Sequence, residues 1–297
     1  MDLRIKLGIA FLVVYIVWGS TYLAIRFVVE TIPPFFMAGT RFIIAGLLLY
    51  ALTSLRGIPA PTSVHWRDAF FVGGLLLLGG NGAVVWAEQW IPSGLTSLLI
   101  ATTGLWMVLL NSLHHRTKPS LGGIFGLFLG FVGVALLVGS IENTSSNNMM
   151  FPAAAIVLFG SFLWAGGSLY SRSAKTSSSQ LQPAAIQMIT GGILLLSASL
   201  ITGEWTRIIL DQVSMRSILS WVYLIIFGSL AAFSAYIWLL KHTTPSRVST
   251  HAYINPLVAL ILGMAFAEEA LTTRNVIAAI IIIISVAIIT TYPAEKE

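Results

Sequence analysis

"WGSTYLAIR", residues 18–26, places four small or polar residues inside an otherwise apolar run, and "LWAGGSLYSR", residues 163–172, resembles it. In both stretches a tryptophan precedes an arginine by eight residues, first Trp18 and Arg26, then Trp164 and Arg172. Polar groups inside a membrane are expensive unless they face protein or a wet cavity. The two stretches therefore predict helices that face an internal space rather than lipid.

The composition places these stretches in a membrane protein. Of 297 residues, 57% are hydrophobic and 9% are charged, whereas a soluble domain has about 25% charged residues. Apolar runs of about 20 residues recur along the chain, and each is long enough to cross a hydrocarbon layer of about 30 Å. The net charge of +5 is too small to suggest nucleic acid as a partner, and the absence of cysteine excludes disulfides and a cysteine nucleophile.

Ten apolar segments predict an all-α integral membrane protein with ten transmembrane helices. "SIENTSSNNMMFP", residues 140–152, is the most polar stretch and predicts a linker between two halves of five spans. We therefore expect a first repeat at 1–140, a linker at 141–151 and a second repeat at 152–297. The expected spans are residues 5–28, 34–56, 68–88, 93–113, 120–140, 152–171, 181–202, 217–240, 246–267 and 273–292.

Lysine and arginine in the loops predict the orientation, because cytoplasmic loops carry an excess of them. With a cytoplasmic N-terminus, eleven of these residues fall on the inner side and four on the outer side, while Arg41 lies within a span. Both termini of this multi-pass protein are therefore expected in the cytoplasm, and the family resemblance given below implies the cell (inner) membrane. The four outer residues are Arg26, Arg207, Arg216 and Arg274.

Two constant offsets indicate an internal duplication. A shift of 146 brings Trp18 onto Trp164 and Arg41 onto Gln187, and a shift of 152 brings Trp86 onto Trp238. Because five spans are an odd number, the second copy enters the membrane with the opposite polarity. Inverted repeats are typical of secondary transporters, in which two similar units rock about a site near the midplane. The repeat therefore predicts transport of a small-molecule substrate by alternating access.

Four segments together resemble the drug/metabolite transporter superfamily, and within it the EamA-domain, YedA-like branch. They are "WGSTYLAIR", "PPFFMAGTRFIIAGLLL", "GGNGAVVWAEQWIPSG" and "HAYINPLVALILGMAFAEEALT". The resemblance covers nearly the whole chain. It implies ten helices, cytoplasmic termini, a central cavity between the repeats, and export of small metabolites such as amino acids.

Two positions depart from the pattern of that family. Gly104 stands where first repeats commonly have proline, while Pro256 is retained in the second repeat, and both are expected at a helix break or hinge. "HHRTKPS" replaces the acidic motif expected after the fourth span, although Glu268 and Glu269 retain it after the ninth. The first-half hinge is therefore expected to bend differently.

Arg41 lies about two turns inside the second expected span, where an arginine raises the free energy of insertion by about 2.5–3.5 kcal/mol. One interpretation is a structural arginine that bonds helix-end carbonyls or reaches outward. The other is a cavity residue that binds a carboxylate of the substrate or pairs with Glu88. A charge at this depth is a candidate for function.

Asn81 and Glu88 share one face of the third expected span. Three glycines around Asn81 weaken the helix and allow close approach of a neighbour or a ligand. Glu88 is either an interfacial cap beside Trp86 and Trp90 or a carboxylate that couples transport to protons.

His251 and Asn255 lie one turn apart, just before Pro256. The proline frees a carbonyl near residue 252, and such broken helices often line transporter sites. His251 is therefore a second candidate for proton coupling, with a neutral packing histidine as the alternative.

Aromatic residues complete the expected cavity. Trp18 lies near the middle of its span, where interfacial anchoring does not explain it. The resemblance favours a cavity wall, which would suit amphipathic solutes through apolar area and cation–π contact with amines. The full set of expected cavity residues is Trp18, Tyr22, Arg41, Asn81, Trp86, Trp164, Gln187, Trp238, His251 and Asn255.

Other functional classes remain as alternatives. A facilitative channel or uniporter is the nearest, and a membrane sensor or enzyme without transport is the more distant. No metalloprotease, nucleophile-elbow, P-loop or dinucleotide motif is present, so we expect no enzyme, cofactor or metal site. The expected partners are the lipid bilayer, a substrate and protons as coupling ion. Gly122, Gly126 and Gly130 are expected to pack within a monomer, with a weak homodimer as the alternative.

Overall fold

The computed structural model describes residues 2–115, 120–144, 149–174, 179, 181–269 and 272–291. Within these ranges the chain contains helices and no strand, and η1 and η4 are π-helical whereas η2 and η3 are 3-10 turns. The elements are α1 (Leu3–Val28), α2 (Pro34–Leu55), α3 (Ser63–Gly73), η1 (Gly74–Asn81), α4 (Gly82–Ala87), α5 (Ser93–Ile100), α6 (Thr103–His115), α7 (Leu121–Thr144), α8 (Met150–Ser173), α9 (Gln182–Ile201), η2 (Glu204–Arg207), η3 (Leu210–Gln212), α10 (Met215–Tyr223), η4 (Leu224–Phe233), α11 (Ser234–His242), α12 (Pro245–Val248), α13 (His251–Phe266) and α14 (Thr273–Thr291).

The helices agree with the apolar segments of the sequence. In the part of the chain that the structure describes, seven helices are long and apolar enough to cross a membrane, and three shorter apolar helices lie at 121–136, 254–266 and 273–285. Helix α7 continues to Thr144, four residues beyond the end expected for the fifth span. The central residues of the linker expected at 141–151, residues 145–148, lie outside the described residues.

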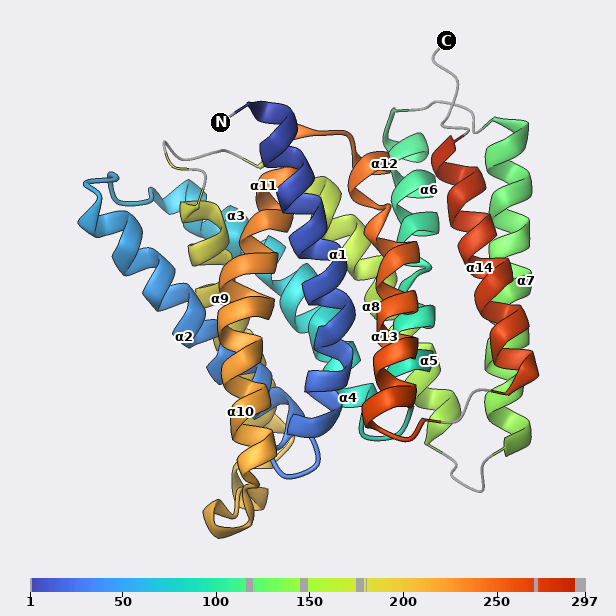
Figure 1. Cartoon of the computed structure of the whole chain (residues 1–297). Helices are drawn as coiled ribbons and strands as arrows, with labels where there is room; N and C mark the ends of the chain where they lie inside the picture. Colours follow the sequence, from blue (N-terminus) through green and yellow to red (C-terminus); the bar gives the residue numbers. More distant parts are fainter. Residues whose placement is uncertain are drawn as a thin grey trace.

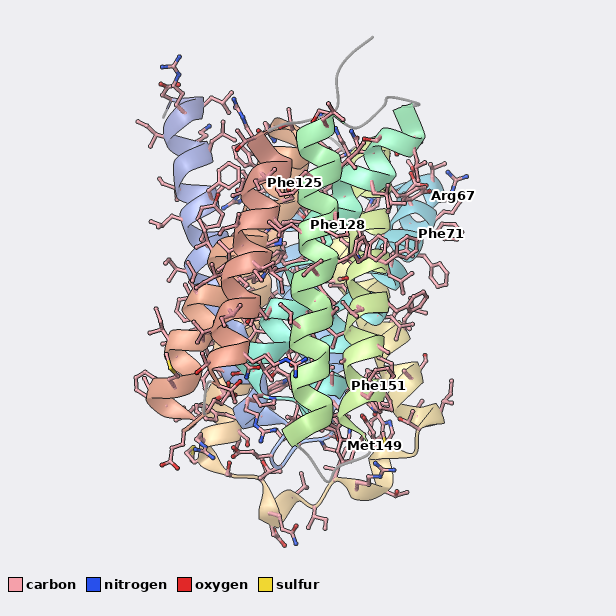
Figure 2. All side chains as sticks on the ribbon, turned by 90° about the vertical axis from the view of Figure 1, so that its right-hand side faces the viewer. Arg67, Phe71, Phe125, Phe128, Met149 and Phe151 are labelled. Atoms are coloured by element: carbon pink, nitrogen blue, oxygen red, sulfur yellow. The ribbon has the colours of Figure 1, made fainter. Side chains whose placement is uncertain are left out.

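The outer surface of the bundle is apolar. Phe125 and Phe128 on α7 are 57% and 66% exposed, and Phe151 on α8 is 52% exposed. Figure 2 shows these side chains on the face formed by α7, α14 and α8. Large apolar side chains are stable on such a surface when lipid covers them, which agrees with a protein embedded in a bilayer.

Two helix pairs hold the bundle at its sides. Helix α2 packs along α9 at one side, and α7 packs along α14 at the other (Figure 1). A Cβ added to Gly46 on α2 would lie 2.8 Å from Ile189 Cγ1, and one added to Gly192 on α9 would lie 2.7 Å from Ile43 Cγ1. The offset of 146 converts the first contact into the second. Both glycines are therefore needed for close backbone approach at corresponding places.

The two arginines of the opening stretches also make corresponding contacts. Arg26 Nη1 donates to the carbonyl oxygen of Glu88 at 2.6 Å, and Arg172 Nη1 donates to that of Leu240 at 3.3 Å. The offset is 146 for the arginines and 152 for the acceptors. Each arginine thus satisfies a carbonyl group at the end of a neighbouring helix, where a cation is favourable. Helices α1 and α8 run in opposite directions, so these contacts lie at opposite ends of the bundle (Figure 1).

Interruptions of regular helix occur at related places in both halves. The π-helical segments η1 and η4 interrupt the third and eighth expected spans, and an offset of 150 relates their first residues. Turns at 101–102 and 249–250 interrupt the fourth and ninth spans. Gly104 is the second residue of α6 and follows the turn at 101–102 directly, whereas Pro256 lies inside a continuous α13.

Pro256 is a buried residue inside α13. A proline removes one intrahelical hydrogen bond, and it is tolerated in a membrane helix where neighbouring groups satisfy the freed backbone. The turn after α12 begins at Ser249, seven residues before Pro256, and α13 begins at His251. Motion at Gly104 or Pro256 therefore stays a prediction.

The glycine repeat of the fifth span packs inside the chain. A Cβ on Gly130 would lie 2.6 Å from Ser285 Oγ, and Ser285 Oγ donates to the carbonyl oxygen of Gly126 at 2.7 Å. Ser285 thus joins α14 to α7 rather than facing a cavity. This contact confirms the expected internal packing for Gly126 and Gly130.

The retained acidic motif caps a helix in the other half of the chain. Glu269 Oε1 accepts hydrogen bonds from Ser93 N at 2.7 Å and Ser93 Oγ at 2.8 Å, and its Oε2 accepts one from Gly94 N at 2.9 Å. These donors lie at the start of α5, where free N–H groups and the helix dipole favour an anion. Glu269 thus joins the end of α13 to the start of α5.

Glu269→Ala is expected to lower the free energy of unfolding by about 1–2 kcal/mol, because the first N–H groups of α5 lose their acceptor. The matched control is Glu268→Ala, since Glu268 is exposed and adjacent in the chain. Thermal unfolding of the purified protein should give a lower midpoint for the first variant than for the second. Equal midpoints would contradict a capping role.

Candidate functional site

A central cavity lies between helices from both halves of the chain. The space that the centre of a water-sized sphere can occupy there is about 60 Å³, which is room for a few water molecules. A solute as large as an amino acid therefore needs side chains to move before it fits. The cavity is lined by Trp18, Thr21, Tyr22, Ile25, Arg41, Phe42, Gly80, Asn81, Val84, Ile100, Thr103, Trp164, Gly228, Phe233, His251 and Asn255.

Seven of the ten cavity residues expected from the sequence come together here. They are distributed over five helical segments: α1, α2, η1, α8 and α13. Both π-helical segments contribute lining residues, Gly80 and Asn81 from η1 and Gly228 and Phe233 from η4. Local π-helix widens a turn and is frequent at functional sites. The seven residues are Trp18, Tyr22, Arg41, Asn81, Trp164, His251 and Asn255.

The two tryptophans related by the offset of 146 meet in this wall. Trp18 and Trp164 contact edge to face, with ring centroids 5.4 Å apart and an interplanar angle of 83°. Tyr236 lies against both rings, at 4.8 Å from Trp18 and 5.7 Å from Trp164. Its hydroxyl accepts a hydrogen bond from Trp164 Nε1 at 2.9 Å. Such aromatic contacts hold a rigid wall that both halves share.

Small residues make room for the tryptophans. A Cβ on Gly80 would lie 2.6 Å from Trp164 Cε3. Trp18 Nε1 donates to the carbonyl oxygen of Gly228 at 3.2 Å. A Cβ on Gly19, within the opening stretch, would lie 2.5 Å from Val258 Cβ on α13. The small residues beside Trp18 therefore serve close packing between helices.

His251 and Asn255 form the α13 side of the cavity and are both 3% exposed. His251 Nδ1 donates to the carbonyl oxygen of Val248 at 2.8 Å, and its ring lies 5.5 Å from that of Trp18. The side-chain amide of Asn255 donates to the carbonyl oxygen of Tyr15 at 3.0 Å in the orientation that suits its neighbours. Both side chains are thus fixed by backbone carbonyl groups.

Arg41 brings a positive charge to the cavity and is 2% exposed. Its Nε donates to Ser229 Oγ at 2.8 Å, and its Cζ lies 4.7 Å above the centre of the Phe42 ring. Nη1 has no hydrogen-bond partner among the described residues. Among the described residues, ion pairs join Arg67 to Asp68 and Arg216 to Glu30. Arg41 and Glu88 therefore do not form an ion pair.

Glu88 lies one helical turn beyond Val84, which lines the cavity. It is fully buried, and neither carboxyl oxygen has a hydrogen-bond partner among the described residues. The charged groups that act on it are Arg26 and Glu269, and it acts in turn on Tyr22. A buried carboxylate without a partner is unfavourable, and holding a proton removes that penalty. Within the described part of the chain, the side chain of Glu88 therefore caps no turn.

The structure places Trp86, Gln187 and Trp238 outside the lining of this cavity. Trp86 packs against the apolar cluster around Ala87 and Leu98. Gln187 is 4% exposed, and Trp238 stacks on His242 with ring centroids 4.1 Å apart. Their places in the repeat do not bring them to the same space as Trp18.

Two wider hollows lie at opposite ends of the bundle. One, of about 280 Å³, lies where α1 ends and α2 begins, and includes Glu30, Gln89 and Arg207. The other, of about 580 Å³, lies between the ends of α6 and α8, and includes Asn111 and Arg172. Helices α1 and α8 end on opposite sides (Figure 1), so one hollow lies at each end of the bundle.

Comparisons with known proteins agree with this architecture. The sequence profile described as the EamA-like transporter family matches residues 6–139 and 151–291. The chain is 36% identical over 282 residues to the inner membrane transporter YedA of Escherichia coli strain K12. The aligned region covers 95% of this chain and 89% of YedA. It is 22% identical over 294 residues to a probable amino-acid metabolite efflux pump of the same strain, covering 93% and 92%. A crystal structure with a TM-score of 0.67 and 18% identity covers 96% of this chain and 97% of its own, which shows a shared fold.

Proposed function

The chain belongs to the EamA-like transporter family, and from that premise we propose that it is a secondary transporter that moves small metabolites across the inner membrane by alternating access. Amino acids and related compounds are the proposed substrates, and export is the proposed direction. The name of one relative, an amino-acid metabolite efflux pump, supports both choices.

The contact between Trp18 and Trp164 carries this proposal. Residues that correspond in the two halves meet at one cavity, with ring centroids 5.4 Å apart. In an inverted-repeat transporter, the substrate site lies at the interface of the repeats. A cavity on that interface can open to either side when the two halves exchange conformations.

The proposed architecture has ten helices in two inverted repeats, at 1–140 and 152–297, with both termini in the cytoplasm. The exchanged contacts of Gly46 with Ile189 and of Gly192 with Ile43 support the duplication. The opposite directions of α1 and α8 support the inversion. The excess of lysine and arginine on one side supports the orientation.

Glu88 is the proposed proton-coupling group. It is fully buried, its carboxyl oxygens have no hydrogen-bond partner among the described residues, and it lies one turn beyond the cavity residue Val84. A carboxyl group in this position can bind a proton from one side and release it to the other as its surroundings change.

Glu88→Gln is expected to abolish accumulation driven by a pH gradient while exchange of labelled for unlabelled substrate continues. The amide keeps the shape of the side chain and removes its titration. Uptake into proteoliposomes with and without an imposed gradient measures both activities, and Glu30→Gln at the exposed outer end is the control. Unchanged gradient-driven accumulation in Glu88→Gln would exclude this role.

Labelling from each side of the membrane tests the proposed two-sided cavity. The chain contains no cysteine, so Ile100→Cys places one thiol in the cavity lining. We expect a membrane-impermeant thiol reagent to label it in right-side-out vesicles and also in inverted vesicles. Ser54→Cys should react from the inside alone, and Thr206→Cys from the outside alone. Labelling of Ile100→Cys from one side only, or from neither, would contradict alternating access.

A further inference from the structure

Three residues that line the central cavity each carry a buried polar atom without a partner in the described part of the chain. Arg41 Nη1, Asn81 Oδ1 and Thr103 Oγ1 are buried and have no hydrogen-bond partner among the described residues. All three residues line the same cavity, although they come from three segments far apart in the sequence. Buried polar groups are nearly always satisfied, so a bound solute or its water shell is the natural partner of this set.

The guanidinium of Arg41 is held in place by its neighbours, and its Nη1 lacks a hydrogen-bond partner among the described residues. Ser229 accepts its Nε–H, and the Phe42 ring lies against its Cζ. A Cβ on Gly228 would lie 2.8 Å from Arg41 Nη2, so the glycine leaves the space that the guanidinium fills. The arginine is thus fixed by one polar contact and by packing, while Nη1 has no acceptor within the residues that the structure describes.

We propose that Arg41 Nη1 binds an anionic group of the transported solute, so that the cavity selects carboxylates and excludes solutes that carry only a positive charge. This inference rests on the proposed transport function and assigns its substrate class. Among the described lining residues no aspartate or glutamate balances the arginine. In surroundings of low dielectric, an uncompensated cation attracts an anion and repels an amine.

The acceptor Asn81 Oδ1 extends the proposed recognition to a donor on the same solute. An ammonium or hydroxyl group beside the carboxylate would satisfy it, which suits amino acids and hydroxy acids. This assignment differs from the expectation that the aromatic wall selects amines by cation–π contact, because the charge of Arg41 outweighs that weaker attraction.

Protection of a cavity thiol against alkylation tests the inference with four probes built on one carbon skeleton. Ile100→Cys is treated with uncharged N-ethylmaleimide in the presence of leucine, isocaproate, leucinamide or isoamylamine. We expect leucine and isocaproate, which carry the carboxylate, to slow the reaction. Leucinamide and isoamylamine lack it and should leave the rate unchanged. Protection by either cationic probe as strong as that by leucine, or by none of the four, would overturn the proposal.

Replacement of the arginine locates the effect. In Ile100→Cys with Arg41→Gln, the concentration of leucine that gives half protection should rise about tenfold to a hundredfold, as expected for loss of a charge-assisted hydrogen bond. Arg41→Lys should retain part of the protection, and Arg56→Gln, at the exposed end of the same helix, should retain all of it. Undiminished protection in Arg41→Gln would overturn the proposal.

Thermal unfolding separates binding from a purely structural role. A substrate-binding arginine leaves an unpaired buried charge, so Arg41→Gln should unfold at the same or a higher temperature than the parent. A lower unfolding temperature with unchanged protection in Arg41→Lys and Arg41→Gln would identify a structural arginine. Labelling of Ile100→Cys from both sides tests the two-sided cavity without any added solute, so it can succeed even when the assignment of Arg41 fails. The comparison of the four solutes is made with Arg41 unchanged, so a change in stability at that position cannot affect it.

Discussion

Gly46→Leu is expected to prevent close packing of α2 on α9 and to remove most of the folded protein. A Cβ at this position would lie 2.8 Å from Ile189 Cγ1 and 2.9 Å from the carbonyl oxygen of Ala185. Overpacking typically destabilises by about 1–3 kcal/mol, and contact with backbone that cannot move favours the upper end of that range. Yield of the monodisperse protein and its unfolding temperature measure the effect.

Gly192→Leu is expected to have a similar effect, because its contacts with Ile43 and Gly39 correspond to those of Gly46. Gly8→Leu is the matched control, since nothing lies within 4 Å of a Cβ on that glycine. If Gly46→Leu behaved like Gly8→Leu, the packing of α2 on α9 would be wrong. A large difference between Gly46→Leu and Gly192→Leu would contradict the proposed duplication.

Trp18→Ala is expected to lower the transport rate at least about tenfold, because it removes the ring shared by both halves of the cavity wall. The variant loses contacts with Trp164, Tyr236 and His251 and the hydrogen bond to Gly228. Removal of a packed tryptophan side chain typically destabilises by about 3–5 kcal/mol, and Trp18 is partly buried. Transport is therefore compared at equal amounts of folded protein.

Phenylalanine at position 18 separates packing from recognition. Trp18→Phe keeps an aromatic ring and loses the hydrogen bond to Gly228, so it should fold better than Trp18→Ala and recover part of the transport. Trp238→Ala is the control, because Trp238 stacks on His242 outside the cavity lining. Equal transport by Trp18→Ala and Trp238→Ala would show that the first tryptophan only packs.

The sequence predicts the membrane-crossing helices well, because apolar length alone determines which segments stay in lipid. The expected spans end within a few residues of the observed helices, as in α2, α9 and α14. The fifth expected span ends at residue 140, whereas α7 continues to Thr144.

The candidate site is only partly predictable, because tertiary contacts decide which polar and aromatic residues face one space. Trp18 and Trp86 give the same signal, a tryptophan in an apolar span, yet only Trp18 lines the cavity. The offset of 146 correctly placed Trp164 in the cavity lining, because Trp164 and Trp18 both lie at the interface of the two halves. The same offset placed Gln187 there wrongly, although its counterpart Arg41 does line the cavity.

Other features of the site leave little trace in a single sequence. The π-helical segments depend on a shift in backbone hydrogen bonding, and glycine is the weak signal for them at Gly80 and Gly228. Thr103 adjoins the expected hinge at Gly104, but its position in the cavity follows from the turn at 101–102. Tyr236 lies within the eighth expected span, and only the fold places it against both tryptophans.

Counterflow in proteoliposomes tests the central claim, that this protein is a carrier with one site open to each side in turn. Vesicles loaded with excess unlabelled amino acids are diluted into a trace of the same amino acids carrying a radiolabel. A carrier accumulates the label transiently above its equilibrium level, because exchange outpaces net flow, and we predict this overshoot. A label that only rises to equilibrium would indicate a pore, and no uptake beyond that of protein-free vesicles would contradict transport of this substrate class.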